Sequence, residues 1–250
     1  MRAILTYHSV DDSGSIISTD REAFRRQVDW LAAGAVEVVS IEDLLSVPDE
    51  DDAVALTFDD GFANFASVAA PILEEAGLPA TVFVVTDYVG GASSWPNSVT
   101  QPVPVLPLLD WPDLALLHER GVEIGAHSRS HPRLATLSRA ELADEIGGSA
   151  ERLGAELGVY PRTFCYPYGS VNAAAKEAVA EVFPLACTTE LGLLDACSDV
   201  YLLPRLDMYY FRDRGRLESW GTPAFDRYLA LRRAARKLRV SVRRAMGSDD

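Results

Sequence analysis

Two adjacent carboxylates are the first residues of this sequence whose types and spacing could do chemistry. Asp59 and Asp60 stand in the segment TFDDG, directly after an apolar run. Like charges so close together are costly unless a cation or hydrogen bonds stabilise them, and one metal ligand beside one free base would resolve the conflict. The alternative is a plain strand-to-helix turn, in which Asp60 caps the helix and Gly61 relaxes the backbone.

A pair of histidines is the second candidate for chemistry. His127 and His131, in HSRSH, are two of the four histidines of the chain, and in a helical segment both imidazoles could face one ion. With Asp60 they give the usual composition of a catalytic zinc site that keeps one position open for water. Such an ion lowers the pKa of bound water and polarises a carbonyl oxygen, while Asp59 takes the proton. The pattern therefore predicts metal-assisted hydrolysis.

Three further residues could complete such a site. The peptide N–H of Tyr168, in YPYG, could stabilise an oxyanion because Pro167 fixes the turn and Gly169 allows a tight backbone. The same composition is also typical of ordinary turns. His8 follows the first predicted strand and could protonate a leaving amine, and Arg205 could pair with the free carboxylate and orient it. A structural role is the alternative for His8 and Arg205.

Alternating strand and helix patterns must position these residues. β-rich runs are predicted at residues 3–7, 36–40, 54–58, 80–85, 122–125, 163–166 and 202–209. Helical patterns follow residues 18–20 and Ser138, and cover residues 62–76, 113–120 and 172–182. Because several strands are almost entirely apolar, we expect a parallel α/β fold, either a barrel or an open doubly wound sheet. In both, functional side chains gather where the strands end.

The ordered motifs TFDDG, HSRSH and FCYPYG closely resemble those of the polysaccharide deacetylase family, carbohydrate esterase family 4, with its NodB-homology domain. The resemblance implies an α/β fold, a distorted (β/α)7 barrel, and a divalent-metal-dependent N-deacetylase of acetylated amino sugars, with zinc as the expected ion. It implies that Asp59 is the catalytic base and that the backbone of Tyr168 binds the oxyanion. It implies that the metal ligands are Asp60, His127 and His131.

Two departures from the family pattern accompany this resemblance, which runs to about residue 210. Cys165 stands where many members have an arginine, and no histidine follows His131, so the late Leu-x-His motif that supplies the general acid is absent. The chain is similar to a subgroup with an early YHxV and a late LPR motif, in which the motifs are circularly rearranged. On that interpretation His8 is the acid and Arg205 replaces the missing arginine.

Charge and cysteine content narrow the functional class. The net charge of the 250-residue chain is −14, which argues against a nucleic-acid partner. The three cysteines have neither disulfide nor metal-site spacing, and no apolar run suits a signal peptide or a membrane span. We therefore expect a cytoplasmic protein. The family resemblance implies that its substrate is a carbohydrate or a glycolipid. Two alternatives stay open: an amidohydrolase acting on a small non-sugar amide, and a catalytically inactive carbohydrate-binding relative.

The C-terminal region differs in charge from the rest of the chain. We expect a barrel over residues 1–212 and an extension over residues 213–250. Residues 228–250 carry seven basic and two acidic side chains, which leaves −19 on residues 1–227. One helical stripe of residues 228–246 carries Tyr228, Leu231, Ala235, Leu238, Val242 and Met246. This basic amphipathic helix could make a peripheral contact with anionic lipid, or dock on its own barrel or a partner.

One long loop is also expected, over residues 90–109. This segment is rich in Gly, Ser and Pro and has no hydrophobic period. Loops of such length are often lids or binding walls. A variable surface insertion is the alternative.

Overall fold

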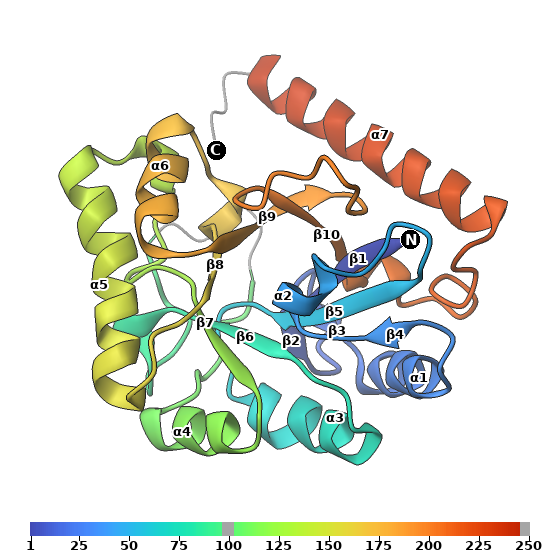
Figure 1. The fold of residues 1–250 in the computed structure, drawn as a ribbon, viewed down its shortest axis with the longest axis horizontal. Helices are drawn as coiled ribbons and strands as arrows, with labels where there is room; N and C mark the ends of the chain where they lie inside the picture. The colour runs from blue at the N-terminus through green and yellow to red at the C-terminus, as the bar shows by residue number, and fades with distance from the viewer. Residues whose placement is uncertain (97–102, 246–250) are drawn as a thin grey trace.

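Seven parallel strands form a closed barrel in the computed structural model, which describes residues 1–96 and 103–245 and, in the last helix, side chains as far as residue 238 (Figure 1). The barrel closes because β1 pairs with both β5 and β10. Its strands are, in order around the ring, β5 (Ala53–Phe58), β1 (Arg2–Tyr7), β10 (Leu203–Asp207), β9 (Leu185–Leu191), β8 (Thr163–Cys165), β7 (Glu123–Ala126) and β6 (Thr81–Val84). The predicted (β/α)7 barrel is confirmed, and the doubly wound alternative is wrong.

Three short strands supplement the ring. β4 (Glu37–Val38) pairs with the first residues of β5, at the amino end of the barrel. β2 (Ser9–Val10) and β3 (Ser18–Thr19) form a separate parallel pair immediately after β1. The segment that joins β2 to β3 therefore begins at the carboxyl end of the barrel.

Helices cover the outside of the ring, and some of their ends coincide with predicted caps. The helix expected over residues 62–76 begins instead as a π-helix, Phe65–Ala69, and the helix expected over residues 113–120 begins at Trp111. The helices are α1 (Arg21–Ala32), α2 (Ile41–Leu44), α3 (Ala70–Ala76), α4 (Trp111–Glu119), α5 (Arg139–Leu157), α6 (Ala173–Val182) and α7 (Pro223–Ala245). Ser138 and Glu141 form a capping box at the start of α5, so two backbone donors are satisfied there. Gly77 ends α3 with a φ of 66°, a conformation that favours glycine.

Side chains along each strand alternate between two apolar layers. On β1, Ala3, Leu5 and Tyr7 face the layer beneath the helices, whereas Ile4 faces the barrel interior. The other residues that fill the interior include Ala55, Phe83, Cys165, Cys187 and Leu203. Because successive strand residues point to opposite faces, this alternation also decides which polar residues at the strand ends point inward.

Three differences from the sequence-based expectations concern strands and helix ends. β9 was not predicted, because Thr188 and Glu190 interrupt its apolar run. The strand expected over residues 202–209 ends at Asp207, and a 3-10 turn, Met208–Phe211, follows it. Helix α7 begins at Pro223 rather than residue 228, and Met246 lies outside the described residues. Among the described helices, none has the length and apolar character needed to cross a membrane.

Candidate active site

The strand alternation directs Asp59 into the barrel. Ala55 faces the interior, and Thr57, two residues on, contacts Arg205 there. Asp59 follows in the same phase, just after β5 ends at Phe58. Its carboxylate is 2% exposed and meets a guanidinium that comes from the same interior row of β10. The predicted pairing of Arg205 with the carboxylate is therefore present in the structure.

Arg205 and Asp59 form a bidentate pair. Nη1 and Nη2 donate to the two carboxylate oxygens at 2.7 Å each. The remaining donors bind the carbonyl oxygen of Thr188 at 2.8 Å and the hydroxyl of Thr6 at 2.7 Å. Burial, the largest single influence, would raise the pKa of Asp59, but the charge and hydrogen bonds of Arg205, together with the charges of His8 and His127, outweigh it and lower this pKa below its ordinary value. Asp59 is therefore held as an oriented anion.

Cys165 lies beside this pair. Arg205 Nη2 donates to its sulfur at 3.1 Å, and the thiol sulfur lies 3.7 Å from Asp59 Oδ2. Burial raises the pKa of this thiol to about 11, so it stays neutral. Arg205 on β10 therefore contacts the side chain of Cys165, while its role as a replacement for an arginine at position 165 stays a prediction.

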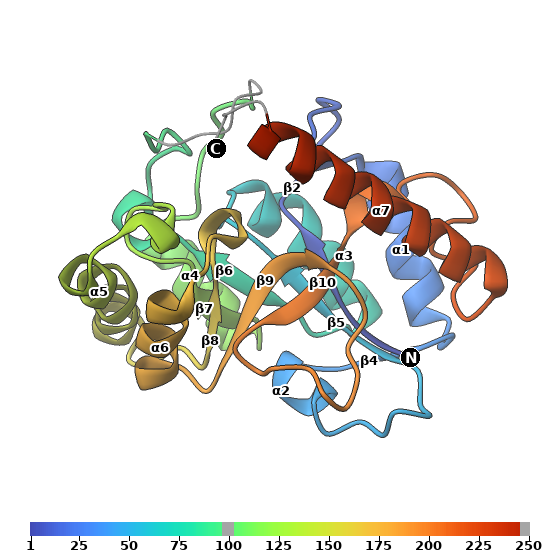
Figure 2. The same cartoon turned by 90° about the horizontal axis from the view of Figure 1, so that it is seen from above.

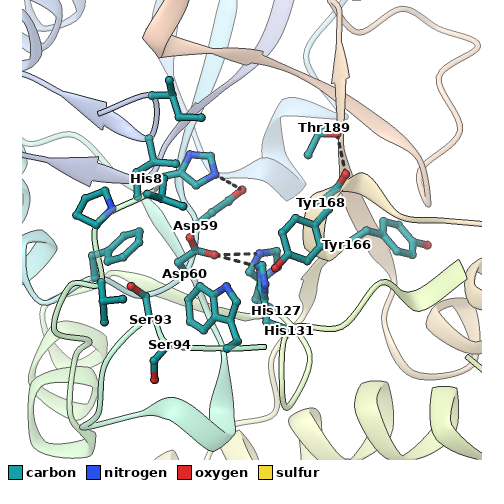
Figure 3. Close-up of a pocket in the computed structure, with 17 residues that line it drawn as sticks. His8, Asp59, Asp60, Ser93, Ser94, His127, His131, Tyr166, Tyr168 and Thr189 are labelled. Carbon is teal, nitrogen blue, oxygen red and sulfur yellow. Dashed lines mark hydrogen bonds and ion pairs between the residues drawn. The ribbon is translucent and has the colours of Figure 1, made fainter. Parts of the chain in front are cut away.

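His8 reaches the same carboxylate from the end of β1. Its Nε2 lies 3.8 Å from Asp59 Oδ2, and its side chain is 27% exposed. Figure 3 shows the imidazole of His8 beside Asp59 at the edge of the cavity. The structure therefore brings the expected acid close to the expected base while leaving it accessible to a substrate. The acid role itself stays a prediction.

Asp60 turns away from its neighbour because its backbone is left-handed, with a φ of 71°. Its Oδ1 lies 3.4 Å from His127 Nε2 and 3.3 Å from His131 Nε2. Although burial alone would raise it, the pKa of Asp60 is held well below its ordinary value by hydrogen bonds and charge from the two imidazoles. The two adjacent carboxylates therefore serve different neighbours, and the simple capping turn does not describe them.

The HSRSH segment is a loop rather than the helical turn that the four-residue spacing suggested. It follows β7, and Ser128 and His131 both have a φ of 63°. The Glu145 carboxylate of α5 accepts the backbone N–H groups of Arg129 and Ser130 at 2.9 Å each. These contacts fold the loop so that the two imidazole centroids lie 4.9 Å apart. The imidazoles converge through left-handed backbone rather than helical periodicity.

The donor atoms of this cluster fit a divalent cation. Asp60, His127 and His131 each offer one ligand atom, and the three atoms lie within 4.8 Å of one another. His127 Nδ1 donates to the carbonyl oxygen of Cys165 at 2.6 Å, which leaves Nε2 as the ligating nitrogen. The residues present thus match the carboxylate and imidazole donors that zinc accepts. A second grouping of Asp59, His127 and Cys165 is less suitable, because Arg205 already occupies both oxygens of Asp59.

Tyr168 lies in the turn Pro167–Gly169, also with a left-handed φ of 58°. Glycine is required at position 169, because a Cβ there would lie 2.1 Å from Thr189 Oγ1. The Tyr168 ring packs on His131, with centroids 4.5 Å apart, and the Arg133 guanidinium lies 4.7 Å from the centroid of the Tyr168 ring. The structure places Tyr168 at the site, while the direction and role of its N–H stay predictions.

One cavity of about 350 Å³, within the range usual for small-ligand pockets, is lined by every predicted site residue except Arg205. Figure 3 shows Asp59 and Asp60 opposite His127 and Tyr168. The described parts of the loop over residues 90–109 contribute residues 93–95 and 103–105 to the wall, whereas residues 97–102 lie outside the described chain. The wall interpretation of this loop therefore holds for its described parts.

Trp95 is a site residue that sequence reasoning missed. Its ring packs against His131, with centroids 4.4 Å apart, and is 6% exposed. It would shield that imidazole from water on one side. A single large aromatic within a Gly-, Ser- and Pro-rich loop after a strand is the signal that could have identified it.

Comparison with known proteins agrees with this fold. The family model described as polysaccharide deacetylase matches residues 46–182. YxkH of Bacillus subtilis is 22% identical over 209 residues, which span 81% of this chain and 70% of that protein. Chitin deacetylase 1 of Cryptococcus neoformans is 28% identical over 66% of this chain, and the match spans only 31% of that longer protein.

Solved structures share the fold. The Streptococcus pyogenes deacetylase PplD in complex with acetate superimposes with a TM-score of 0.72 at 22% identity, covering 82% of this chain and 91% of that one. At this identity the likeness supports the barrel. The family-model match covers more than half of the sequence. The chain belongs to the polysaccharide deacetylase family.

Proposed function

We propose that this protein is a divalent-metal-dependent hydrolase that removes N-acetyl groups from an amino-sugar polysaccharide, oligosaccharide or glycolipid. The observation that carries the proposal is the convergence of Asp60, His127 and His131 beside a separately held Asp59. One relative is named a chitin deacetylase, and the similar PplD structure contains acetate, the product expected of such a reaction. The cavity of about 350 Å³ has room for one sugar unit.

Asp60, His127 and His131 would hold the ion, for which we propose zinc. When bound, the ion lowers the pKa of a water molecule enough for a weak base to deprotonate it, and it polarises the acetamide carbonyl. Two features of the chain prepare these ligands. Cys165 fixes the orientation of His127 through its carbonyl oxygen, and Trp95 and Tyr168 pack on two sides of His131.

Asp59 is the proposed base. The fork of Arg205 fixes the plane of its carboxylate and keeps it ionised, so the base needs no reorganisation before it accepts a proton. Its Oδ2 is also the oxygen nearest His8. The acceptor and the proposed proton donor therefore lie side by side at the cavity edge.

His8 and Tyr168 complete the proposed reaction. His8 donates a proton to the leaving amine, so the carbon–nitrogen bond breaks as acetate is released. The backbone N–H of Tyr168 stabilises the oxyanion that develops on the acetamide oxygen. The backbone of Tyr168 is left-handed, and the next residue, Gly169, lies so close to Thr189 that a Cβ there would clash.

Acetate release tests the proposal. Purified protein, stripped of metal and reconstituted with zinc, is assayed on N-acetylglucosamine oligomers and on simple acetamides. We expect acetate from the oligomers only, and none from the stripped protein. Turnover of simple amides alone would show that the substrate is a small amide rather than a sugar. Zinc binding without any turnover would favour an inactive carbohydrate-binding relative.

We also propose that the protein works in the cytoplasm. The cysteines Cys165, Cys187 and Cys197 are all free, as a reducing compartment allows. Subcellular fractionation of the source cells tests this location. Recovery of the protein outside the cytoplasmic membrane would contradict it.

A further inference from the structure

Exposed apolar side chains gather at the mouth of the cavity. Ile16, between β2 and β3, and Val105, in the loop before α4, are both large apolar residues exposed to solvent, and both line the cavity. They come from segments about ninety residues apart in the chain. Single exposed apolar residues are ordinary, but a group of them around one opening indicates an interaction surface.

Helix α7 is docked at its beginning only. Phe225 and Leu229 are buried, and the Phe225 ring packs on Phe211 with centroids 5.7 Å apart. Further along, Leu231 is 70% exposed and Leu238 is 66% exposed. These two leucines lie seven residues apart and therefore share one helix face. The predicted apolar stripe therefore faces solvent at its described residues beyond Tyr228, which are Leu231, Ala235 and Leu238.

The other face of α7 carries arginines toward the barrel. The Arg232 guanidinium lies 5.0 Å from the centroid of the Tyr210 ring, and Arg236 is half-buried and acts electrostatically on Asp207 at the end of β10. Docking on the acidic body therefore accounts for this face. It leaves the face of Leu231 and Leu238 without a described protein partner.

Helix α7 extends to the same end of the molecule as the cavity. Figure 2 shows α7 running from the flank of the barrel up to the end where the segment between β2 and β3 and the loop after β6 project. The influence of Arg236 on Asp207 agrees with this placement, because β10 ends at Asp207. Ile16 and Val105 thus line the opening itself, and α7, which carries the exposed Leu231 and Leu238, runs beside the same end of the barrel.

We propose that this mouth surface, made of Ile16, Val105, Leu231 and Leu238, binds an anionic phospholipid bilayer and that the cavity receives an acetylated amino sugar attached to a lipid. This inference rests on the proposed deacetylase function. Residues 228–250 carry seven basic and two acidic side chains, whereas residues 1–227 carry a charge of −19, so the net charge of the C-terminal segment favours anionic lipid while that of the rest of the chain does not.

A bilayer fits this surface better than a second copy of the chain does. A protein partner seated on the mouth would close the cavity, and a second copy would bring two strongly acidic barrels together. A lipid-attached sugar instead enters the cavity from the surface to which the mouth is bound. Basic helices with an apolar face bind such surfaces by shallow insertion.

Vesicle co-sedimentation tests the surface. The zinc-loaded full chain is mixed with vesicles of phosphatidylcholine alone or with one quarter phosphatidylglycerol. We expect binding to the anionic vesicles and a loss of about tenfold or more in the variant L231E/L238E and in V105E. The matched control is V159E, since Val159 is 48% exposed and precedes β8, at the opposite end of the barrel. Equal binding by all variants, or no binding by the wild type, would overturn the proposal.

Two further measurements separate this proposal from the proposed function. L231E/L238E and V159E should release acetate from dissolved oligosaccharides, without vesicles, at the wild-type rate. If the wild type binds vesicles but deacetylates no acetylated sugar, the result supports the lipid-binding surface and contradicts the proposed deacetylase function. Analytical ultracentrifugation without vesicles checks self-association: a wild-type dimer that L231E/L238E converts to monomer would assign the surface to a second copy and overturn the lipid proposal.

Discussion

Asp59 and Asp60 are neighbours in the chain, yet their surroundings differ. Asp59 lies in the barrel interior, where Arg205 binds both carboxylate oxygens at 2.7 Å. Asp60 lies among the loops, on left-handed backbone, with one oxygen 3.3–3.4 Å from two imidazole nitrogens. The interior therefore supplies a complete partner for one carboxylate, whereas the loops collect three ligand atoms around a point suited to a cation.

This difference teaches how one short motif can supply two chemical roles. The strand phase fixes Asp59, because Ala55, Thr57 and Asp59 all point inward. The positive φ of Asp60 breaks that phase and directs the second carboxylate to a different set of neighbours. Substitutions on each side of this boundary should have separable effects on metal content, turnover and stability.

The largest expected effect belongs to the loop region. His127→Ala should lose bound metal and reduce turnover by about 10⁴-fold, since a bound ion contributes several kcal/mol of transition-state stabilisation. Elemental analysis and acetate release, measured on the same preparation, check this. Near-native turnover in a metal-free variant would show that the cluster has no part in the reaction.

Removing the proposed base should reduce turnover less than removing a metal ligand does. Asp59→Asn should lower turnover by about 10³-fold while the ion is retained, because the amide cannot accept the proton but the three ligands are unchanged. Circular dichroism is needed beside the rate, since the substitution also removes the partner of Arg205. A folded variant with a rate close to that of the wild type would assign the base to another residue.

Arg205→Met should act mainly on stability. Loss of the guanidinium leaves the Asp59 carboxylate buried without its partner, and we expect a decrease of about 3–5 kcal/mol in the free energy of unfolding. Urea unfolding measures it. The double variant Asp59→Asn with Arg205→Met should recover part of this loss. A cost for Arg205→Met below about 1 kcal/mol, typical of exposed pairs, would contradict the closed interior.

The smallest expected effect is a difference in cysteine labelling, which measures how accessible the barrel interior is without any mutation. Burial raises the pKa of Cys165 to about 11 and that of Cys187 to about 12, so both thiols are neutral at pH 8 and form thiolate only as the pH rises toward those values. Exposed Cys197 should react with iodoacetamide first. Mass spectrometry should find one label in the folded protein and three in denaturant. Equal labelling of Cys165 and Cys197 would mean that the interior opens readily.

Much of the barrel could be predicted because its strands and caps are local signals. The apolar β5 and the capping box of Ser138 can each be recognised within a few residues. β9 could not, since its second half is polar and its stability comes from pairing with β8 and β10. Parallel pairing joins segments that are distant in sequence, so the hydrophobic periodicity of one segment does not predict its partner strands.

The site shows the same division. The residue types predicted the grouping of Asp60 with His127 and His131, but not the loop that produces it. That loop depends on Glu145, which lies on α5 and binds two of its backbone N–H groups. Likewise, LPR predicted a role for Arg205, whereas its contact with Cys165 depends on the packing of separate strands inside the barrel.

Zinc binding by two single variants tests the central claim most directly. Asp59→Asn and Asp60→Asn change the same functional group at consecutive positions, and each is titrated with zinc by calorimetry after metal removal. We predict about one equivalent of zinc per chain for Asp59→Asn and strongly weakened binding for Asp60→Asn. The reverse result, or equal binding by both, would contradict the division of the two carboxylates between base and ligand.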